Sequence, residues 1–290
     1  MTQVRQAEFG VALGDLPAAE WAAAVVVRHS TRTFTGRPVE PVSFDRVVRF
    51  ASDLPRSHMA RVVVVEHVPS DLFTGLVGGY GRVLGAPSAF VMIGNEADPA
   101  FQESVGYLGE AAMLEATSIG LDTCWIAGLF DRKLAEKIVE LSPGERVLAV
   151  CPFGYAQPRP RASEKFLKRM VGAHKRRPVE EIAPGFDQER WPAWAAEGAR
   201  LARVAPSAAN RQPWSIGLLT EPDPHTRPPE ATGAVISVVE RGAEGNISRR
   251  LDCGIAMLHF EVGARLMGVR GVWEVLSPPQ VARYLIAPPG

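Results

Sequence analysis

The chain has 290 residues, of which 46% are hydrophobic and 22% are charged, a composition typical of a globular protein that buries a sizeable core. Its 32 Lys+Arg residues balance its 32 Asp+Glu residues, and this neutrality argues against nucleic acid as the main partner, because phosphate backbones require a basic excess or patch. The three cysteines form no Cys-x-x-Cys pair, no apolar run reaches about 18 residues, and no metal-binding or signal-peptide pattern occurs, so we expect a cytoplasmic protein without disulfides, metal or a membrane span.

The first half of the chain alternates helical and strand-like patterns. Apolar residues at helical spacing predict helices, and short β-branched runs predict buried strands. Ser43 and Asp131 are suited to cap helices at their N-termini, and Gly120 to end the longest one. The predicted helices are Pro17–Arg28, Phe44–Ser52, Asp98–Ile119 and Arg132–Leu141, and the predicted strands are Arg61–Val68, Ala89–Gly94 and Arg146–Tyr155.

The second half has a similar order of patterns after a basic stretch, Gln157–Arg177, and is interrupted by a Pro-rich loop, Pro222–Pro229. Gly268 is suited to end its long helix. The predicted helices are Ala195–Val204 and Asn246–Met267, and the predicted strands are Trp214–Leu218, Ala234–Glu240 and Trp273–Leu276.

The two halves therefore suggest an internal repeat. One alignment pairs Gly106 with Gly254, Ala116 with Ala264, Gly120 with Gly268, and Trp125 with Trp273. Mixed helix and strand segments can also look alike by chance. If the duplication is real, the halves should pack as a symmetric pair within one chain.

A dense group of polar residues, Arg28-His29-Ser30-Thr31-Arg32, follows the first predicted helix. In an extended segment alternate side chains point the same way, so two guanidiniums and a hydroxyl would share one face. Arginine donors suit a phosphate or polyol. The alternative is a solvated linker with surface arginines.

A second polar group, Ser207, Asn210 and Gln212, lies between Pro206 and Pro213. Prolines fix the turn, and the polar side chains could then bond a planar heterocycle or a ribityl chain. The alternative is a turn whose side chains bond its own backbone.

The cysteines are interpreted as core residues. Cys124 lies in a Gly-containing turn that could offer backbone N–H groups to a ligand, but no adjacent His or Lys argues for a lowered pKa. Cys151 and Cys253 are also expected in the core.

Three other ionisable features remain open. The basic run His174–Pro178 is either a solvated face or a contact to a phosphate. His259 is expected to be a satisfied buried histidine. Asp252 is expected to be a helix cap or an ion-pair partner of Arg249 or Arg250.

Together these segments resemble the FMN-dependent nitroreductase superfamily. Residues 28–34 are similar to its Arg-x-Ser-x-Arg/Lys-x-Phe motif, and residues 206–214 to its Pro-Ser-x-x-Asn-x-Gln-Pro-Trp motif. Residues 120–125 with Gly128 resemble a third motif, and Arg176-Arg177-Pro178 resembles the basic phosphate contact near the family's C-terminus.

The order of the motifs differs from that of ordinary members, in which the second motif follows the first by a few tens of residues. Here residues 55–61 occupy that place with only a proline and a shifted serine, and the second half has no Arg-x-Ser-x-Arg. Ordinary members are homodimers with the flavin in the interface. The sequence therefore resembles a single-chain subfamily of two fused halves, with one composite site and an empty pseudo-symmetric one.

The resemblance implies an α+β fold of two tandem nitroreductase-like repeats, each a mostly antiparallel sheet flanked by helices, packed as an intramolecular pseudo-dimer. The halves are 1–177 and 178–290, and the chain is expected to be a monomer with one FMN. The basic stretch and the Pro-rich loop would border the mouth of the active site.

The resemblance also implies residue roles. Arg28, Ser30 and either Arg176 or Arg177 would contact the phosphate, and His29 and Arg32 would lie near the ribityl chain and the pyrimidine edge. Pro206, Ser207, Asn210 and Gln212 would reach in from the second half, while the backbone N–H groups of Ala127 and Gly128 would approach flavin N5 and O4.

No side chain is expected to be catalytic, since the flavin carries the chemistry. Hydride would pass from NAD(P)H to the flavin and then to a small electron acceptor such as a nitroaromatic or a quinone. The alternatives are a flavin-sequestering protein without turnover, a specialised flavin-dependent dehydrogenase, and a relative of the fold that binds no flavin.

Overall fold

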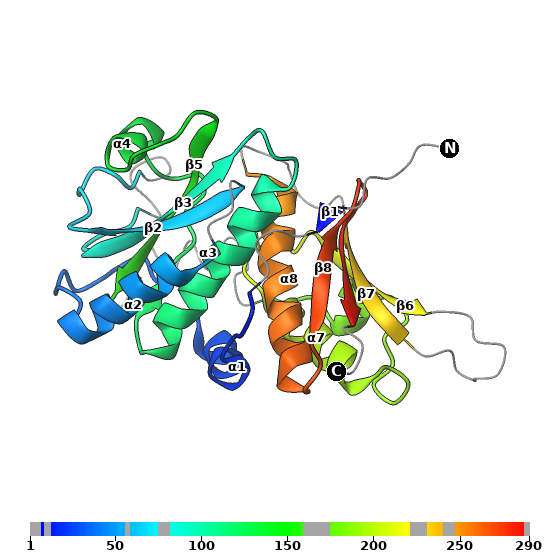
Figure 1. Cartoon of the computed structure of the whole chain (residues 1–290). Helices are drawn as coiled ribbons and strands as arrows, with labels where there is room; N and C mark the ends of the chain where they lie inside the picture. The colour runs from blue at the N-terminus through cyan, green and yellow to red at the C-terminus, as the bar shows by residue number, and fades with distance from the viewer. Residues whose placement is uncertain are drawn as a thin grey trace.

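The computed structural model describes residues 7–8, 13–55, 59–74, 82–158, 175–220, 231–239 and 247–286. The Pro-rich loop 222–229 and residues 159–174 of the basic stretch lie outside the described residues. Two antiparallel sheets stand at opposite ends of the molecule with helices between them (Figure 1). The expected α+β fold with two sheet-and-helix layers is confirmed.

The first half forms a four-stranded sheet in the order β2-β3-β5-β4, and every strand pair is antiparallel. Its central strand β3 is buried on both faces: Phe90 and Met92 belong to one apolar cluster, and Val91 and Ile93 to another, as the alternation of a strand requires. The elements are α1 (Ala18–Val27), α2 (Pro41–Asp53), β2 (Ala60–Glu66), β3 (Ser88–Asn95), α3 (Phe101–Ser118), β4 (Asp122–Thr123), α4 (Arg132–Lys137) and β5 (Glu145–Gly154).

The second half forms a five-stranded antiparallel sheet in the order β1-β8-β9-β7-β6. Its edge strand β1 (Ala7–Glu8) comes from the beginning of the chain. The other elements are α6 (Val179–Ile182), α7 (Ala193–Arg203), η2 (Ala208–Asn210), β6 (Trp214–Thr220), β7 (Ala231–Val238), α8 (Arg249–Leu266), β8 (Gly271–Val275) and β9 (Gln280–Ile286).

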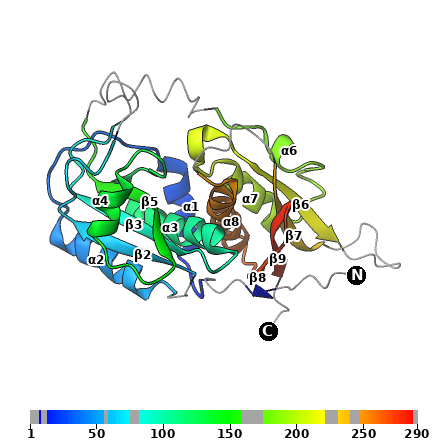
Figure 2. The ribbon, with the colours of Figure 1, turned by 90° about the horizontal axis from the view of Figure 1, so that it is seen from above.

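The long helices α3 and α8 run side by side between the sheets in both views (Figures 1 and 2). A Cβ on Gly106 would lie 2.1 Å from the Leu251 carbonyl oxygen, and a Cβ on Gly254 would lie 2.2 Å from the Glu103 carbonyl oxygen. Each helix thus presents a glycine to the other's backbone at aligned positions, which is the reciprocal contact of a two-fold axis. Among the described helices, none is long and apolar enough to cross a membrane.

Several expected details are confirmed. Gly120 and Gly268 follow α3 and α8 with φ of 83° and 79°, the left-handed conformation that a helix-ending glycine adopts. The Asp131 side chain accepts from the Leu134 N–H at 3.0 Å at the start of α4. The division of the chain at 177/178 stays a prediction.

Other details were predicted wrongly. Ser43 does not cap α2, because the helix begins earlier, at Pro41; proline fits the first helical turn, where its missing N–H is not needed. Helix α4 ends at Lys137, before the predicted Leu141. Strand β9 was missed, since Gln280–Ile286 lacks clear alternation.

Candidate functional site

The segment after α1 runs along the edge of the first sheet. Arg28 closes the helix with an extended backbone, and Ser30 then forms a parallel bridge with Thr123 of β4. The Arg32 carbonyl accepts from the Leu84 N–H at 2.9 Å. The extended conformation inferred from the sequence is therefore present, and it begins at the end of α1, which buries one face.

Arg28 points into the protein. Its side chain is only 5% exposed, and its Nε lies 3.8 Å from Glu110 Oε1 on α3. Its Nη1 is buried and has no hydrogen-bond partner among the described residues. A buried guanidinium nitrogen without an acceptor is costly, so this atom marks a place for an anionic or carbonyl oxygen.

Glu110 connects both halves. Its carboxylate accepts from Trp125 Nε1 at 2.6 Å and lies 2.8 Å from His259 Nε2 on α8. The other nitrogen of His259, Nδ1, lies 3.1 Å from the Leu201 carbonyl oxygen. His259 is thus the satisfied buried histidine expected from the sequence.

The charge states in this cluster follow from the partners. Burial by itself raises the pKa of Glu110, but the hydrogen bond and charge of His259, with Arg28 and Trp125, outweigh it and leave the pKa below its ordinary value. Glu110 is therefore held as a carboxylate beside His259 and Arg28.

The turn at residues 206–214 is tightly wound. Ala209, Asn210 and Gln212 have φ of 49°, 56° and 47°, a region that non-glycine residues occupy only when the surroundings hold them there. Ser207 Oγ accepts from the Gln212 N–H at 2.9 Å, and the Ala208 N–H donates to Asp252 at 3.1 Å. The side chains of this turn do bond its own backbone.

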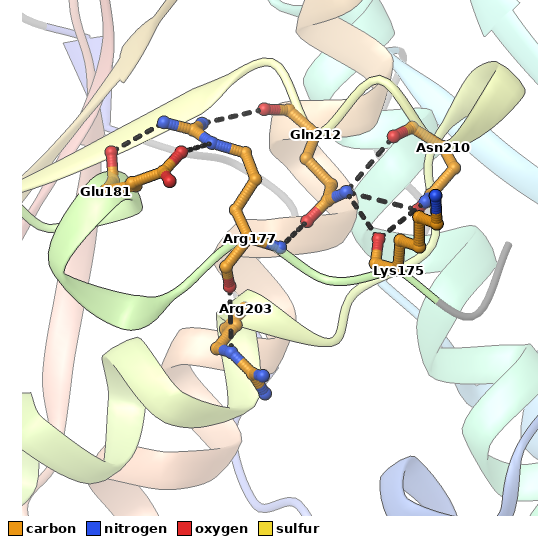
Figure 3. A network of polar contacts seen from close by, with 6 residues as sticks. All are labelled: Lys175, Arg177, Glu181, Arg203, Asn210 and Gln212. Carbon is orange, nitrogen blue, oxygen red and sulfur yellow. Dashed lines mark hydrogen bonds and ion pairs between the residues drawn. The ribbon is translucent and has the colours of Figure 1, made fainter. Parts of the chain in front are cut away.

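The amides of this turn also hold the basic segment that precedes α6 (Figure 3). Gln212 Oε1 accepts from the Arg177 N–H at 2.9 Å, and Gln212 Nε2 donates to the Lys175 carbonyl at 3.2 Å. Asn210 Nδ2 donates to the same carbonyl at 2.8 Å, and Arg203 donates to the Arg177 carbonyl. Residue 176 is therefore fixed from both sides, and its guanidinium donates to Asn210 Oδ1.

Arginines from distant parts of the chain come together here. Burial, with the nearby positive charges of Arg28 and Arg203, lowers the pKa of Arg176 to about 10, and Glu110 opposes this shift. Arg176 is thus close enough to Arg28 for their charges to interact. Arg177 instead pairs with Glu181 of α6, so Arg176 is the member of the predicted pair on which the charge of Arg28 acts.

The Gly128 loop of the first half also touches the second half. A Cβ on Gly128 would lie 3.2 Å from the Ile247 side chain. The Ile247 carbonyl accepts from Arg211 at 2.9 Å, and Arg211 belongs to the 206–214 turn. The loop and the turn are therefore linked through a single residue, Ile247.

The ion-pair partner expected for Asp252 was wrong. Asp252 pairs with Arg211 at 2.7 Å, because the first turn of α8 lies against the 206–214 turn. Arg250 instead crosses to Glu103 on α3.

The remaining predicted residues lie around this cluster or in the core. His29 is 59% exposed, with Nε2 4.0 Å from Asp122 Oδ1. All three cysteines are buried, as expected. Sequence reasoning missed Glu110 and Arg203; the available signal for Glu110 was an acidic residue inside the small-residue stretch of α3.

Comparisons with known proteins identify the family of the chain. Residues 20–264 match the family model described as "Putative TM nitroreductase". The chain belongs to this nitroreductase family. A putative nitroreductase from Thermotoga maritima has a similar structure, with a TM-score of 0.56 and 22% identity over 95% of this chain and 98% of that chain, which shows that the two share a fold.

Two further solved structures are more distant. A nitroreductase family protein from Clostridium novyi NT is 20% identical over 50% of this chain and 87% of its own, with a TM-score of 0.39. An FMN-dependent nitroreductase from Clostridium difficile R20291 is 18% identical over 51% and 95%, with a TM-score of 0.40. No curated protein matches the chain.

Proposed function

We propose that the protein is an FMN-dependent oxidoreductase that passes hydride from NAD(P)H to a small electron acceptor such as a nitroaromatic or a quinone. One observation carries the proposal beyond family membership. Arg28 has a buried, unpartnered Nη1 among the described residues, and its charge acts on Arg176, which donates to Asn210 of the second half.

The residues present fit a flavin phosphate. Guanidinium groups bind phosphate through charge-assisted hydrogen bonds, and Arg28 and Arg176 would supply them, with Arg176 held by Asn210 of the second half. Ser30 follows Arg28 on the extended segment, and His29 and Arg32 would lie toward the ribityl chain and the pyrimidine edge. Such a site needs both halves, so one composite site per monomeric chain is the simplest arrangement.

FMN, when bound, would supply the hydride chemistry between a nicotinamide and the acceptor. The chain would bind and orient it. Asn210 and Gln212 would act on the phosphate end by holding residue 176, together with Pro206 and Ser207, which shape the turn. The backbone N–H groups of Ala127 and Gly128 would face the reactive edge, where preorganised donors stabilise negative charge. No side chain is needed as a general acid.

The experiment is an absorbance titration of the purified protein with FMN, followed by anaerobic NADPH or NADH. Saturation at one FMN per chain and bleaching by the nicotinamide would support the proposal. Binding without bleaching would favour a flavin-sequestering protein or a specialised dehydrogenase reduced by its own substrate. A protein that takes up no FMN would contradict the proposal.

A further inference from the structure

Two buried carboxylates cross the contact between α3 and α8. Glu110 on α3 accepts from Trp125, and Glu261 on α8 accepts from Trp273 at 2.9 Å; these tryptophans are aligned in the internal repeat. Each carboxylate also contacts a ring on the opposite helix.

The ring partners differ in chemistry. Glu110 lies 2.8 Å from the His259 ring nitrogen Nε2, whereas Glu261 accepts from the Tyr107 hydroxyl at 2.6 Å.

The arginine partners differ more. Arg265 binds Glu261 through Nε at 3.0 Å and Nη2 at 2.7 Å, and its other donors go to the Gly14 and Leu13 carbonyls. At Glu110, Arg28 makes one long contact through Nε, at 3.8 Å, and its buried Nη1 has no partner among the described residues. At Glu261, each guanidinium nitrogen of Arg265 therefore has an acceptor. At Glu110, the Arg28 Nη1 remains a donor without an acceptor among the described residues.

We propose that Glu110 is a positioning residue that holds the Arg28 guanidinium for a phosphate, and thereby makes the site prefer FMN over riboflavin, the same flavin without phosphate. The inference rests on the proposed function and names a determinant of its cofactor selectivity. Glu110 lies on the Nε side of Arg28, and the buried Nη1 keeps no partner among the described residues.

The charges support this role. A single carboxylate, Glu110, lies beside His259 and Arg28, and Arg176 and Arg203 add positive charge nearby. The carboxylate therefore orients Arg28 without neutralising the cluster. A phosphate could supply the missing negative charge.

The position of Glu110 depends on both halves. His259 bonds the carboxylate on one side and the Leu201 carbonyl of α7 on the other, and Trp125 fixes the second carboxylate oxygen. The packing of α3, α7 and α8 thus sets where Arg28 is anchored.

The test compares FMN and riboflavin affinities by flavin fluorescence titration for the full-length wild type, Glu110→Gln and the matched control Glu261→Gln. We expect Glu110→Gln to weaken FMN binding about tenfold or more, the scale of one charge-assisted hydrogen bond, and to leave riboflavin binding unchanged. Glu261→Gln should preserve the ratio of the two affinities.

A double-mutant cycle with Arg28→Gln provides a second readout. If Glu110 acts through Arg28, Glu110→Gln should have no further effect on FMN affinity in the Arg28→Gln protein. If Glu110→Gln does not fold by circular dichroism, Glu110→Asp, which keeps the charge and shortens the side chain, takes its place in both experiments.

Three results would overturn the inference in distinguishable ways. Equal weakening of FMN and riboflavin would assign Glu110 a packing role only. Unchanged or tighter FMN binding would show that it does not position Arg28. A wild type that binds no FMN would remove the proposed function itself.

Discussion

The contact between α3 and α8 is symmetric at its glycines and asymmetric at its carboxylates. Gly106 and Gly254 each meet the backbone of the opposite helix at nearly the same distance. Glu261 is closed by Arg265, whereas Glu110 holds Arg28 only loosely. The close contact between the two helix backbones leaves no room for a side chain, so both halves must keep a glycine there. Buried polar groups can differ between the halves, provided that each has a hydrogen-bond partner.

The largest effect is expected from adding a side chain at either of the two glycines in the contact between α3 and α8. Gly106→Ala and Gly254→Ala should each lower the free energy of unfolding by about 3 kcal/mol, because the new Cβ would overlap a carbonyl oxygen and overpacking costs this much. The free energy of unfolding is measured by urea denaturation.

The control is Gly217→Ala, whose Cβ would meet only the Val235 side chain, at 3.4 Å. It should cost much less than either helix variant. A large difference between the Gly106 and Gly254 variants would argue against the two-fold contact.

The difference between the two carboxylates, Glu110 and Glu261, is tested by substituting Arg28. Arg28→Ala should weaken FMN binding by about 1.5–3 kcal/mol, since it removes charge-assisted donors. Flavin fluorescence quenching measures the affinity. Arg283→Ala, which removes a partly exposed pair with Glu274, should leave it unchanged. Full affinity in the Arg28 variant would make the site assignment wrong.

The basic segment before α6 should respond to the loss of Gln212. Gln212→Ala removes the amide that bonds both Lys175 and Arg177, so the segment should loosen and FMN binding should weaken by about 1 kcal/mol. Trypsin, which cleaves after Lys and Arg except before Pro, should cut after Lys175 or Arg176 faster than in the wild type. Unaltered cleavage and affinity would show that the amide does not hold the segment.

The smallest effect concerns acid stability. The pKa of Glu110 lies below the ordinary value of 4.5, so the unfolded chain takes up a proton first as the pH falls. The stability that Glu110 contributes is therefore complete above about pH 4.5 and is lost as the pH drops through its lower folded pKa. Urea midpoints between pH 6 and pH 3.5 should fall less steeply in Glu110→Gln than in the wild type; identical slopes would contradict the assigned shift.

Much of the fold could be predicted because its signals are local. Helix-ending glycines, β-branched runs and the long small-residue helices each specify structure over a few residues, and the family motifs added the layout of two sheets. Strand β9 escaped because its neighbours in the sheet, β7 and β8, determine its pairing rather than any pattern of its own.

The candidate site was predictable only in part. Arg28 and the 206–214 turn lie in recognisable motifs. Proposing Arg176 rather than Arg177 for the phosphate depends on the ion pair between Arg177 and Glu181. The role of Glu110 depends on His259 in the other half. Such partners are chosen by three-dimensional packing, which spacing along one chain does not encode.

Strand β1 pairs with β8, so the beginning of the chain completes a sheet whose other strands all come from the second half. During synthesis on the ribosome, the four strands of the first sheet can pair with one another before the second half has been made. Residues 7–8 must wait until β8 has been made, and the carbonyls of Leu13 and Gly14 must wait for Arg265. Residues 7–8, 13 and 14 should therefore complete their contacts only after β8 and Arg265 have been made, among the last steps of folding.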